Sequence, residues 1–116
     1  MESIKEISPC FDKITRVTDS KEFIQTFCIK SLKLIEEFNS VYSNAIASQQ
    51  LSDLDAITHK ISSTMKWLDL DEFVSLTKSY KDLTMSDQIT KKKFLAEVMH
   101  YSKMIEDSIR SKLQEL

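Results

Sequence analysis

The chain has 116 residues, of which 41% are hydrophobic and 29% charged, and its formal net charge is -2. This length suits one domain with a single core, the hydrophobic fraction excludes a disordered chain, and the charge lacks the basic surplus of a nucleic-acid binder. No apolar run approaches the roughly 18 residues of a membrane span, and residues 1–10 contain no signal-peptide core.

Glycine is absent from the sequence, and proline occurs once, at Pro9. Tight hairpins and phosphate-binding loops rely on glycine for positive φ angles and for close backbone approach, so β-rich folds and Walker-type or Rossmann nucleotide sites are excluded. An all-helical domain remains. The two cysteines, Cys10 and Cys28, lack metal-ligand spacing, and we expect free thiols, with a disulfide as the less favoured alternative.

Residues 1–10 have the character of a polar lead-in or linker, and residues 11–116 that of one helical domain. Residues 11–18 predict a short helix with Phe11, Ile14 and Val17 on one side. A long helix at about 20–48 follows, and Asp19 with Glu22 has the spacing of a capping box at its start. The centre of its predicted apolar stripe is Phe23, Phe27, Leu34, Phe38, Val41 and Ala45, widened by Ile24, Ile35, Tyr42 and Ile46.

A second helix is predicted at about 51–68, capped by Ser52 or Asp53, and a third at about 71–82, capped by Asp71. Between them, Asp69 is expected to turn the chain where glycine is missing. A fourth helix at about 87–115 completes an all-α, antiparallel four-helix bundle with a short additional N-terminal helix. We expect a monomer, because these helices can cover one another's apolar residues: Leu51, Leu54, Ile57, Ile61, Met65 and Leu68 in the second, Phe73, Val74, Leu76 and Tyr80 in the third, and Leu95, Val98, Ile105, Ile109 and Leu113 in the fourth.

The second predicted helix carries His59 on the side opposite its apolar stripe. At about 100° per residue, His59 lies about 140° from Leu54. An exposed helical histidine is most often only a solvated side chain, and His100, which also points outward, is interpreted in that way because Met99, Tyr101 and Met104 surround it. The outward face around His59 differs, since small side chains leave room for a partner and lysines supply charge for an anion: Ser52, Asp55, Ser62, Ser63 and Lys66, with Lys60 adjacent.

The segment "AITHKISSTMKWLDLDEFVSLTKSYKDL" resembles the phosphoacceptor helix and the following helix of a histidine-containing phosphotransfer (HPt) domain. It is most similar to the variety found in bacterial hybrid two-component regulators. The stretch "FDKITRVTDSKEFIQTFCIKSL" resembles the opening of that family, a short helix that leads into a long one. The commoner family pattern has lysine and glycine where this chain has Ser62 and Ser63, so Lys60 and Lys66 are the available cations.

The resemblance implies a phosphorelay intermediate. His59 would accept a phosphoryl group from an aspartate of a receiver domain, in a response regulator or hybrid sensor kinase, and pass it to another receiver. Lys60, Ser62, Ser63 and Lys66 would stabilise the phosphoryl group or dock the receiver. The chain itself would bind no metal or other cofactor, since the Mg²⁺ belongs to the receiver. The resemblance also implies a cytoplasmic location, in which the chain is either a separate protein or the cytoplasmic part of a larger membrane sensor kinase. No ATP-dependent kinase activity of the chain itself is expected.

Other interpretations remain open. The chain is alternatively a helical interaction module in which His59 is incidental. A histidine-kinase dimerisation segment is less favoured, because that family usually has an acidic residue where Lys60 follows the histidine. Asp55 is either a partner that orients the imidazole or an unrelated surface carboxylate, and Trp67 is either an anchor or the border of a docking surface. The run Lys91–Lys93 is interpreted as a solvated patch.

Overall fold

The computed structural model describes residues 9–82 and 87–116. Most of the predicted lead-in, and residues 83–86 of the last predicted break, lie outside these ranges. Within them the chain is all helical, without a β-strand. The elements are α1 (Asp12–Val17), α2 (Lys21–Ser48), α3 (Leu51–Trp67), α4 (Asp71–Lys78), the 3-10 helix η1 (Ser79–Asp82) and α5 (Gln88–Glu115).

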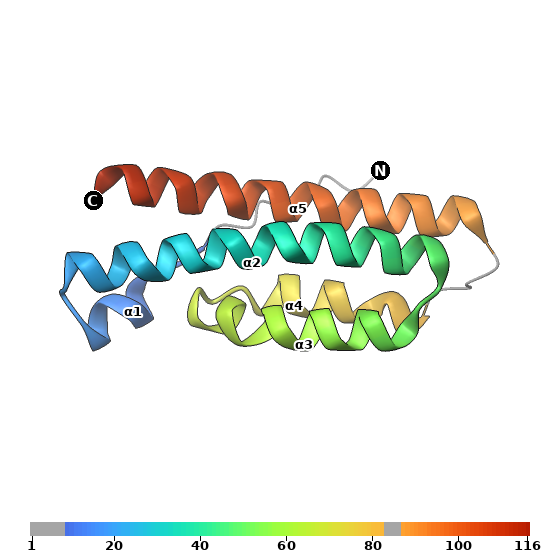
Figure 1. The fold of residues 1–116 in the computed structure, drawn as a ribbon, viewed down its shortest axis with the longest axis horizontal. Helices are drawn as coiled ribbons and strands as arrows, with labels where there is room; N and C mark the ends of the chain where they lie inside the picture. The colour runs from blue at the N-terminus through green and yellow to red at the C-terminus, as the bar shows by residue number, and fades with distance from the viewer. Residues whose placement is uncertain (1–8, 83–86) are drawn as a thin grey trace.

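The two long helices, α2 and α5, lie antiparallel along the length of the molecule (Figure 1). The shorter α3 and α4 run back and forth beneath them, so each helix is antiparallel to the next in sequence. α2 packs against both α5 and α3, α3 packs against α4, and α4 makes a smaller contact with α5. α1 lies at the end of the molecule where α2 begins and α5 ends (Figure 1). This arrangement is compatible with the expected four-helix bundle and its extra helix.

The helix ends agree with the sequence pattern to within a few residues, but several caps differ. Asp87, for which no capping role was predicted, caps α5, and its carboxylate accepts hydrogen bonds from the backbone N–H groups of Ile89 and Thr90, at 3.0 and 3.1 Å. The predicted Asp19–Glu22 capping box is wrong. Ser20 caps α2 instead, and its hydroxyl accepts a hydrogen bond from the Phe23 N–H at 3.3 Å.

The predicted caps of the next two helices are also wrong, because both helices begin earlier than their polar residues suggested. Gln50 precedes α3 without a side-chain capping bond, so Ser52 and Asp53 lie inside its first turn. Asp71 is the first residue of α4 rather than its cap. Acidic residues in a first turn still stabilise a helix through its dipole, which explains why they occur there.

Two residues with side chains take the left-handed backbone conformation that glycine usually occupies. Gln49 ends α2 with a φ of 57°, and Asp69 follows α3 with a φ of 56°. The predicted role of Asp69 as a turn residue is therefore confirmed. Gln49 gave no such signal in the sequence, and its conformation lets α3 begin almost immediately after α2 ends.

The buried face of α2 is rotated around the helix axis relative to the predicted apolar stripe. Phe23 is 52% exposed, and Phe27, Leu34 and Val41 are only half-buried. Apolar residues cover so much of the circumference of α2 that periodicity alone does not locate the centre of its buried face. The positions of α3 and α5 decide it, and the buried line consists of Ile24, Cys28, Ser31, Leu32, Ile35, Phe38, Tyr42, Ala45 and Ile46.

In the part of the chain that the structure describes, the buried polar atoms of side chains have hydrogen-bond partners, with one exception. The Tyr42 hydroxyl donates to the Thr77 carbonyl at 2.8 Å, and burial raises the pKa of this phenol. Lys91 is only 2% exposed, and its ammonium has no hydrogen-bond partner among the residues that the structure describes. The interpretation of residues 91–93 as a solvated patch is therefore wrong for Lys91, which lies one turn before the buried Phe94 on the same side of α5.

Candidate functional site

His59 lies on the exposed face of α3, as its angular position predicts. The opposite face is anchored in the core, where Leu54, Ile61 and Met65 have no exposed surface. Such packing holds the helix backbone in place, because well-packed cores resist displacement. The imidazole therefore combines access from solvent with a fixed origin on the helix.

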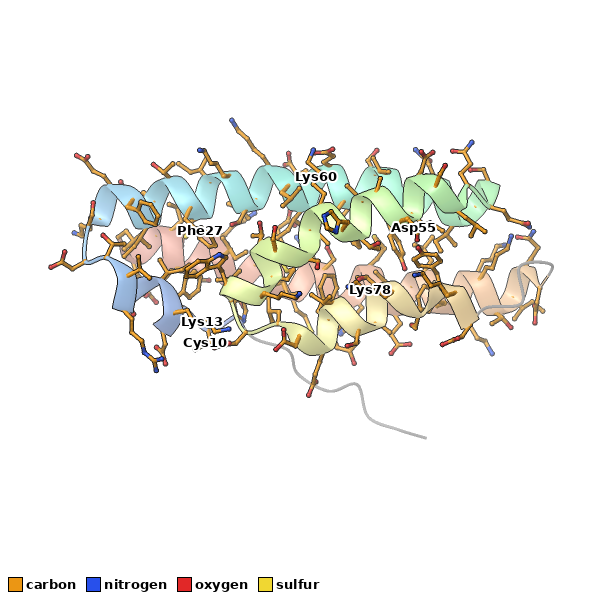
Figure 2. The ribbon with its side chains drawn as sticks, turned by 90° about the horizontal axis from the view of Figure 1, so that it is seen from below. Cys10, Lys13, Phe27, Asp55, Lys60 and Lys78 are labelled. Carbon is orange, nitrogen blue, oxygen red and sulfur yellow. The ribbon has the colours of Figure 1, made fainter. Side chains whose placement is uncertain are left out.

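Lys60 points away from the centre of this face toward α2. Its ammonium donates hydrogen bonds to both carboxylate oxygens of Glu37, at 2.8 and 2.9 Å. Both side chains are about half exposed, at 56% and 44%, so this is a surface ion pair of modest strength. Figure 2 shows Lys60 on the α2 side of α3. Of the two lysines predicted to stabilise a phosphoryl group, Lys60 is therefore already in an ion pair.

Ser63 and Lys66 line an open hollow of about 380 Å³ together with Lys13 and Trp67. Lys66 lies about 20° around the helix from His59 and two turns, or roughly 10 Å, further along it. Helical side chains lean toward the helix N-terminus, which is the direction of His59, so the long Lys66 side chain can reach toward the imidazole. Lys66 has no ion-pair partner among the described residues.

Ser62 does not lie on the outward face where the sequence analysis put it, since it is only 6% exposed. It is about 80° from Leu54 around the axis, on the flank of α3 rather than opposite the stripe. Thr58, on the same flank, is 3% exposed, and its hydroxyl donates to the Leu54 carbonyl at 2.7 Å. The predicted outward face is too wide because α3 packs against two neighbours, α2 and α4.

Asp55, one of whose predicted roles was to orient the His59 imidazole, forms a hydrogen bond with a different residue. Its carboxylate accepts a hydrogen bond from the hydroxyl of Tyr80, a buried residue of η1. This contact joins the first half of α3 to the segment after α4. Lys78, an exposed residue in the last turn of α4, lies on the same side of the molecule as Asp55 and Lys60 (Figure 2), and the sequence analysis did not single it out.

A second, smaller hollow of about 190 Å³, lined by apolar residues and called here the apolar hollow, shares Trp67 with the first one. Its other walls come from α1 and from the first turns of α2: Ile14, Val17, Phe23 and Phe27. Val17, Phe23 and Trp67 are 66%, 52% and 46% exposed, which is unusual for large apolar side chains that lie together. Val17 and Phe23 were predicted to pack inside, whereas a place at the border of a docking surface was one of the two alternatives for Trp67.

His100 is also exposed, so exposure alone does not distinguish the two histidines. Its ring meets the neighbouring Tyr101 edge to face, with 5.6 Å between the ring centres. His100 lines neither of the two hollows. His59 does not line them either, but Ser63, one turn after it on α3, and Lys66, two turns after it, both line the larger hollow. The nearness of these two residues along α3 therefore distinguishes the surface of His59 from that of His100.

Two further tests of the described residues concern metals and membranes. No three side chains of the metal-binding types converge there into a group that fits a metal ion. None of the described helices combines the length and the apolarity of a bilayer span.

Comparison of the chain with protein-family models, curated proteins and solved structures gave no match.

Proposed function

We propose that the protein is a phosphorelay carrier, in which His59 accepts a phosphoryl group from a receiver-domain aspartate and passes it to another receiver. The observation that carries this proposal is the exposed His59 on a helix whose other face is fully buried, next to a hollow lined by Ser63 and Lys66. Transfer between two proteins needs a nucleophile that a second active site can enclose, and a buried imidazole would not serve.

The chemistry needs little from this chain besides position and charge. A neutral imidazole uses a ring-nitrogen lone pair to attack the phosphorus of the aspartyl phosphate. The new N–P bond forms as the P–O bond to the aspartate breaks, and the released carboxylate keeps that bonding pair. The other ring nitrogen carries the proton, and the positive charge on the ring offsets the charge of the phosphoryl oxygens. The reverse reaction delivers the group to a second receiver, and Mg²⁺ is contributed by the receivers.

Lys66 is the better candidate for the cation that stabilises the transferring group. Lys60 is directed to Glu37, with which it forms a bidentate pair. Lys66 lies two turns after His59 on nearly the same side of α3, and it has no such partner among the described residues. The hydroxyl of Ser63, one turn after His59, is available as a hydrogen-bond donor, whereas the burial of Ser62 argues against direct contact with a phosphoryl group.

The exposed apolar residues support docking of a protein rather than of a small molecule. We define the docking surface as Val17, Phe23, Ser63, Lys66 and Trp67. Exposed aromatic residues at the edge of a hollow are typical anchors of protein interfaces, and the adjacent lysine complements the anionic phosphorylated site of a receiver. The proposal includes a monomeric, antiparallel four-helix bundle, with receivers of response regulators or hybrid sensor kinases as partners.

Replacement of the histidine provides the direct test. Wild type, His59→Gln and the control His100→Gln are incubated with a panel of phosphorylated receiver domains, and acid-labile, base-stable phosphate on the carrier is followed. We expect labelling of wild type and His100→Gln at equal rates and a loss of at least about a hundredfold in His59→Gln, since no other nucleophile occupies its position. Equal labelling of His59→Gln would rule out His59 as the acceptor.

The apolar hollow also favours a second candidate, a helical interaction module without phosphotransfer. In that case a partner would bind the docking surface with the same affinity for wild type and His59→Gln, and no receiver would label either protein. Measurement of affinity and of labelling on the same samples separates the two functions. Labelling of wild type at His59 would eliminate the module as the sole function.

A further inference from the structure

α1 is too short to be stable without contacts to the rest of the molecule. It has six residues, Ile14 is its only buried residue, and Phe11 at its start makes no side-chain capping bond. Isolated helices of this length do not persist in water, because the cost of nucleation exceeds the gain from so few hydrogen bonds. The position of α1 therefore depends on the groups that fasten it.

Most of these groups meet at the end of α3. The Lys13 ammonium donates a hydrogen bond to the Lys66 carbonyl at 3.0 Å and pairs with the Asp69 carboxylate at 2.7 Å. The Cys10 N–H donates to the Leu68 carbonyl at 2.8 Å. Figure 2 shows Cys10 and Lys13 together beside this end of α3. One side chain of α1 thus joins a carbonyl of the last helical turn and the carboxylate of the turn residue.

The position of Lys13 is electrostatically favourable. The last turn of a helix leaves carbonyl groups unpaired and carries partial negative charge, which a cation stabilises. Asp69, which follows α3 in the left-handed conformation, places its negatively charged carboxylate at the same end of the helix. The hydrogen bond between the two side chains raises the pKa of Lys13 and lowers the pKa of Asp69, so both charges are favoured in the folded protein.

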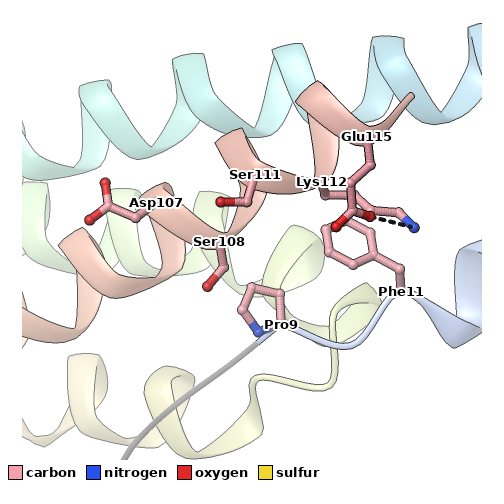
Figure 3. Close-up of a pocket in the computed structure, with 7 residues that line it drawn as sticks. All are labelled: Pro9, Phe11, Asp107, Ser108, Ser111, Lys112 and Glu115. Carbon is pink, nitrogen blue, oxygen red and sulfur yellow. Dashed lines mark ion pairs between the residues drawn. The ribbon is translucent and has the colours of Figure 1, made fainter.

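The segment before α1 is fastened to a second helix. The Lys112 ammonium of α5 lies 5.4 Å from the centre of the Phe11 ring, a cation–π distance, and Lys112 also pairs with Glu115 at 4.0 Å. Figure 3 shows Pro9 and Phe11 against this last part of α5. Phe11 holds the start of α1 to α5, and Lys13 sets where the helix meets α3.

α1 in turn shapes the surface at the end of α3, about two turns beyond His59. Ile14 and Val17 form one wall of the apolar hollow, and Trp67, in the α3 turn that Lys13 contacts, forms another. We propose that Lys13 is a positioning residue for the docking surface, since it fixes α1 against the end of α3 and so keeps the apolar hollow formed. The identity of the docking partner, a receiver domain, rests on the proposed function. The role of Lys13 in holding α1 rests only on its contacts with Lys66 and Asp69.

The first test does not need a partner, because Trp67 is the only tryptophan of the chain and lines both hollows. Acrylamide quenching of its fluorescence is measured in Lys13→Met, in Lys13→Arg, which keeps the cation, and in Lys21→Met, an exposed control at the start of α2. We expect the quenching constant to rise about twofold in Lys13→Met alone. Quenching of Lys13→Met equal to that of wild type would overturn the inference.

The second test compares labelling from a phosphorylated receiver with labelling from phosphoramidate, a small donor that needs no docking. We expect Lys13→Met to raise the KM for the receiver at least about fivefold, to lower the ratio of receiver-driven to phosphoramidate-driven labelling, and to be rescued by Lys13→Arg. An unchanged KM would overturn the role in docking. Failure of the proposed function gives a different result, namely no labelling of wild-type His59 while quenching still responds to Lys13.

Discussion

The surface around His59 and the site of Lys91 differ in how exposed their charged side chains are. On α3, His59 and Lys66 are exposed, and Lys66 has no ion-pair partner among the described residues. On α5, the Lys91 ammonium is also without a partner there, but it is 2% exposed. An ammonium in water costs nothing to leave unpaired, whereas a buried one loses its hydration.

The difference shows that an unpaired charge is not by itself a site. At His59 the charge lies beside an open hollow and exposed apolar residues, so a partner can reach it. At Lys91 the stem of the side chain contributes to packing and the charge is a cost to stability. Function is therefore expected where accessibility, charge and an apolar border coincide, and the following predictions test that distinction.

After the loss expected for replacement of His59 itself, the largest effect is expected at the apolar border. Trp67→Ala removes the residue shared by both hollows and should lower kcat/KM for transfer from a receiver about thirtyfold, since central aromatic residues of interfaces contribute about 2 kcal/mol or more. Lys103→Met, on the exposed face of α5, is the matched control and should have no effect. A Trp67→Ala rate within a factor of two of wild type would remove the apolar hollow from the docking surface.

A smaller effect should separate the two lysines of the His59 surface. Lys66→Met is expected to lower the maximal rate of transfer about tenfold, equivalent to about 1.4 kcal/mol of transition-state stabilisation, because the cation faces the developing charge. Lys60→Met should lower it no more than about twofold, since Glu37 already engages that ammonium. Single-turnover kinetics at saturating receiver measure both, and the reverse order would assign the role to Lys60.

The smallest effect concerns stability at the Lys91 site. Lys91→Met keeps an unbranched side chain of similar length but removes the buried ammonium, and should raise the free energy of unfolding in urea by about 1 kcal/mol. Lys92→Met, at the exposed neighbouring position, should change it by less than about 0.5 kcal/mol. Transfer activity should not respond to either. A lower stability of Lys91→Met would show that the ammonium is stabilised in the folded protein.

The sequence predicted the helices well where its signals were local. The absence of glycine excluded most other folds, the spacing of Leu54, Ile57 and Ile61 located the buried face of α3, and the predicted start of the last helix at about residue 87 lies one residue from that of α5. The exposed position of His59 followed from the same periodicity, because it depends only on the angle between residues of one helix. These features are decided within a single helical segment.

The sequence did not predict features that depend on which helices meet. Periodicity predicts Ser62 on the outward face, but it is buried because α3 packs on both α2 and α4. Phe23, predicted at the centre of the apolar stripe of α2, lies at the edge of the buried face. The apolar hollow needs α1 beside Trp67, and that arrangement depends on Lys13 reaching a carbonyl 53 residues away in the chain.

The amino-acid sequence by itself therefore determined an all-helical chain and the residue that stands outward at the middle of α3. Only the tertiary structure decided which of the surrounding side chains accompany His59, which lysine is already paired, and which ammonium is buried. The physical reason is that helical periodicity is set by local backbone geometry, whereas burial and pairing at the edge of a helix depend on the neighbours that pack against it.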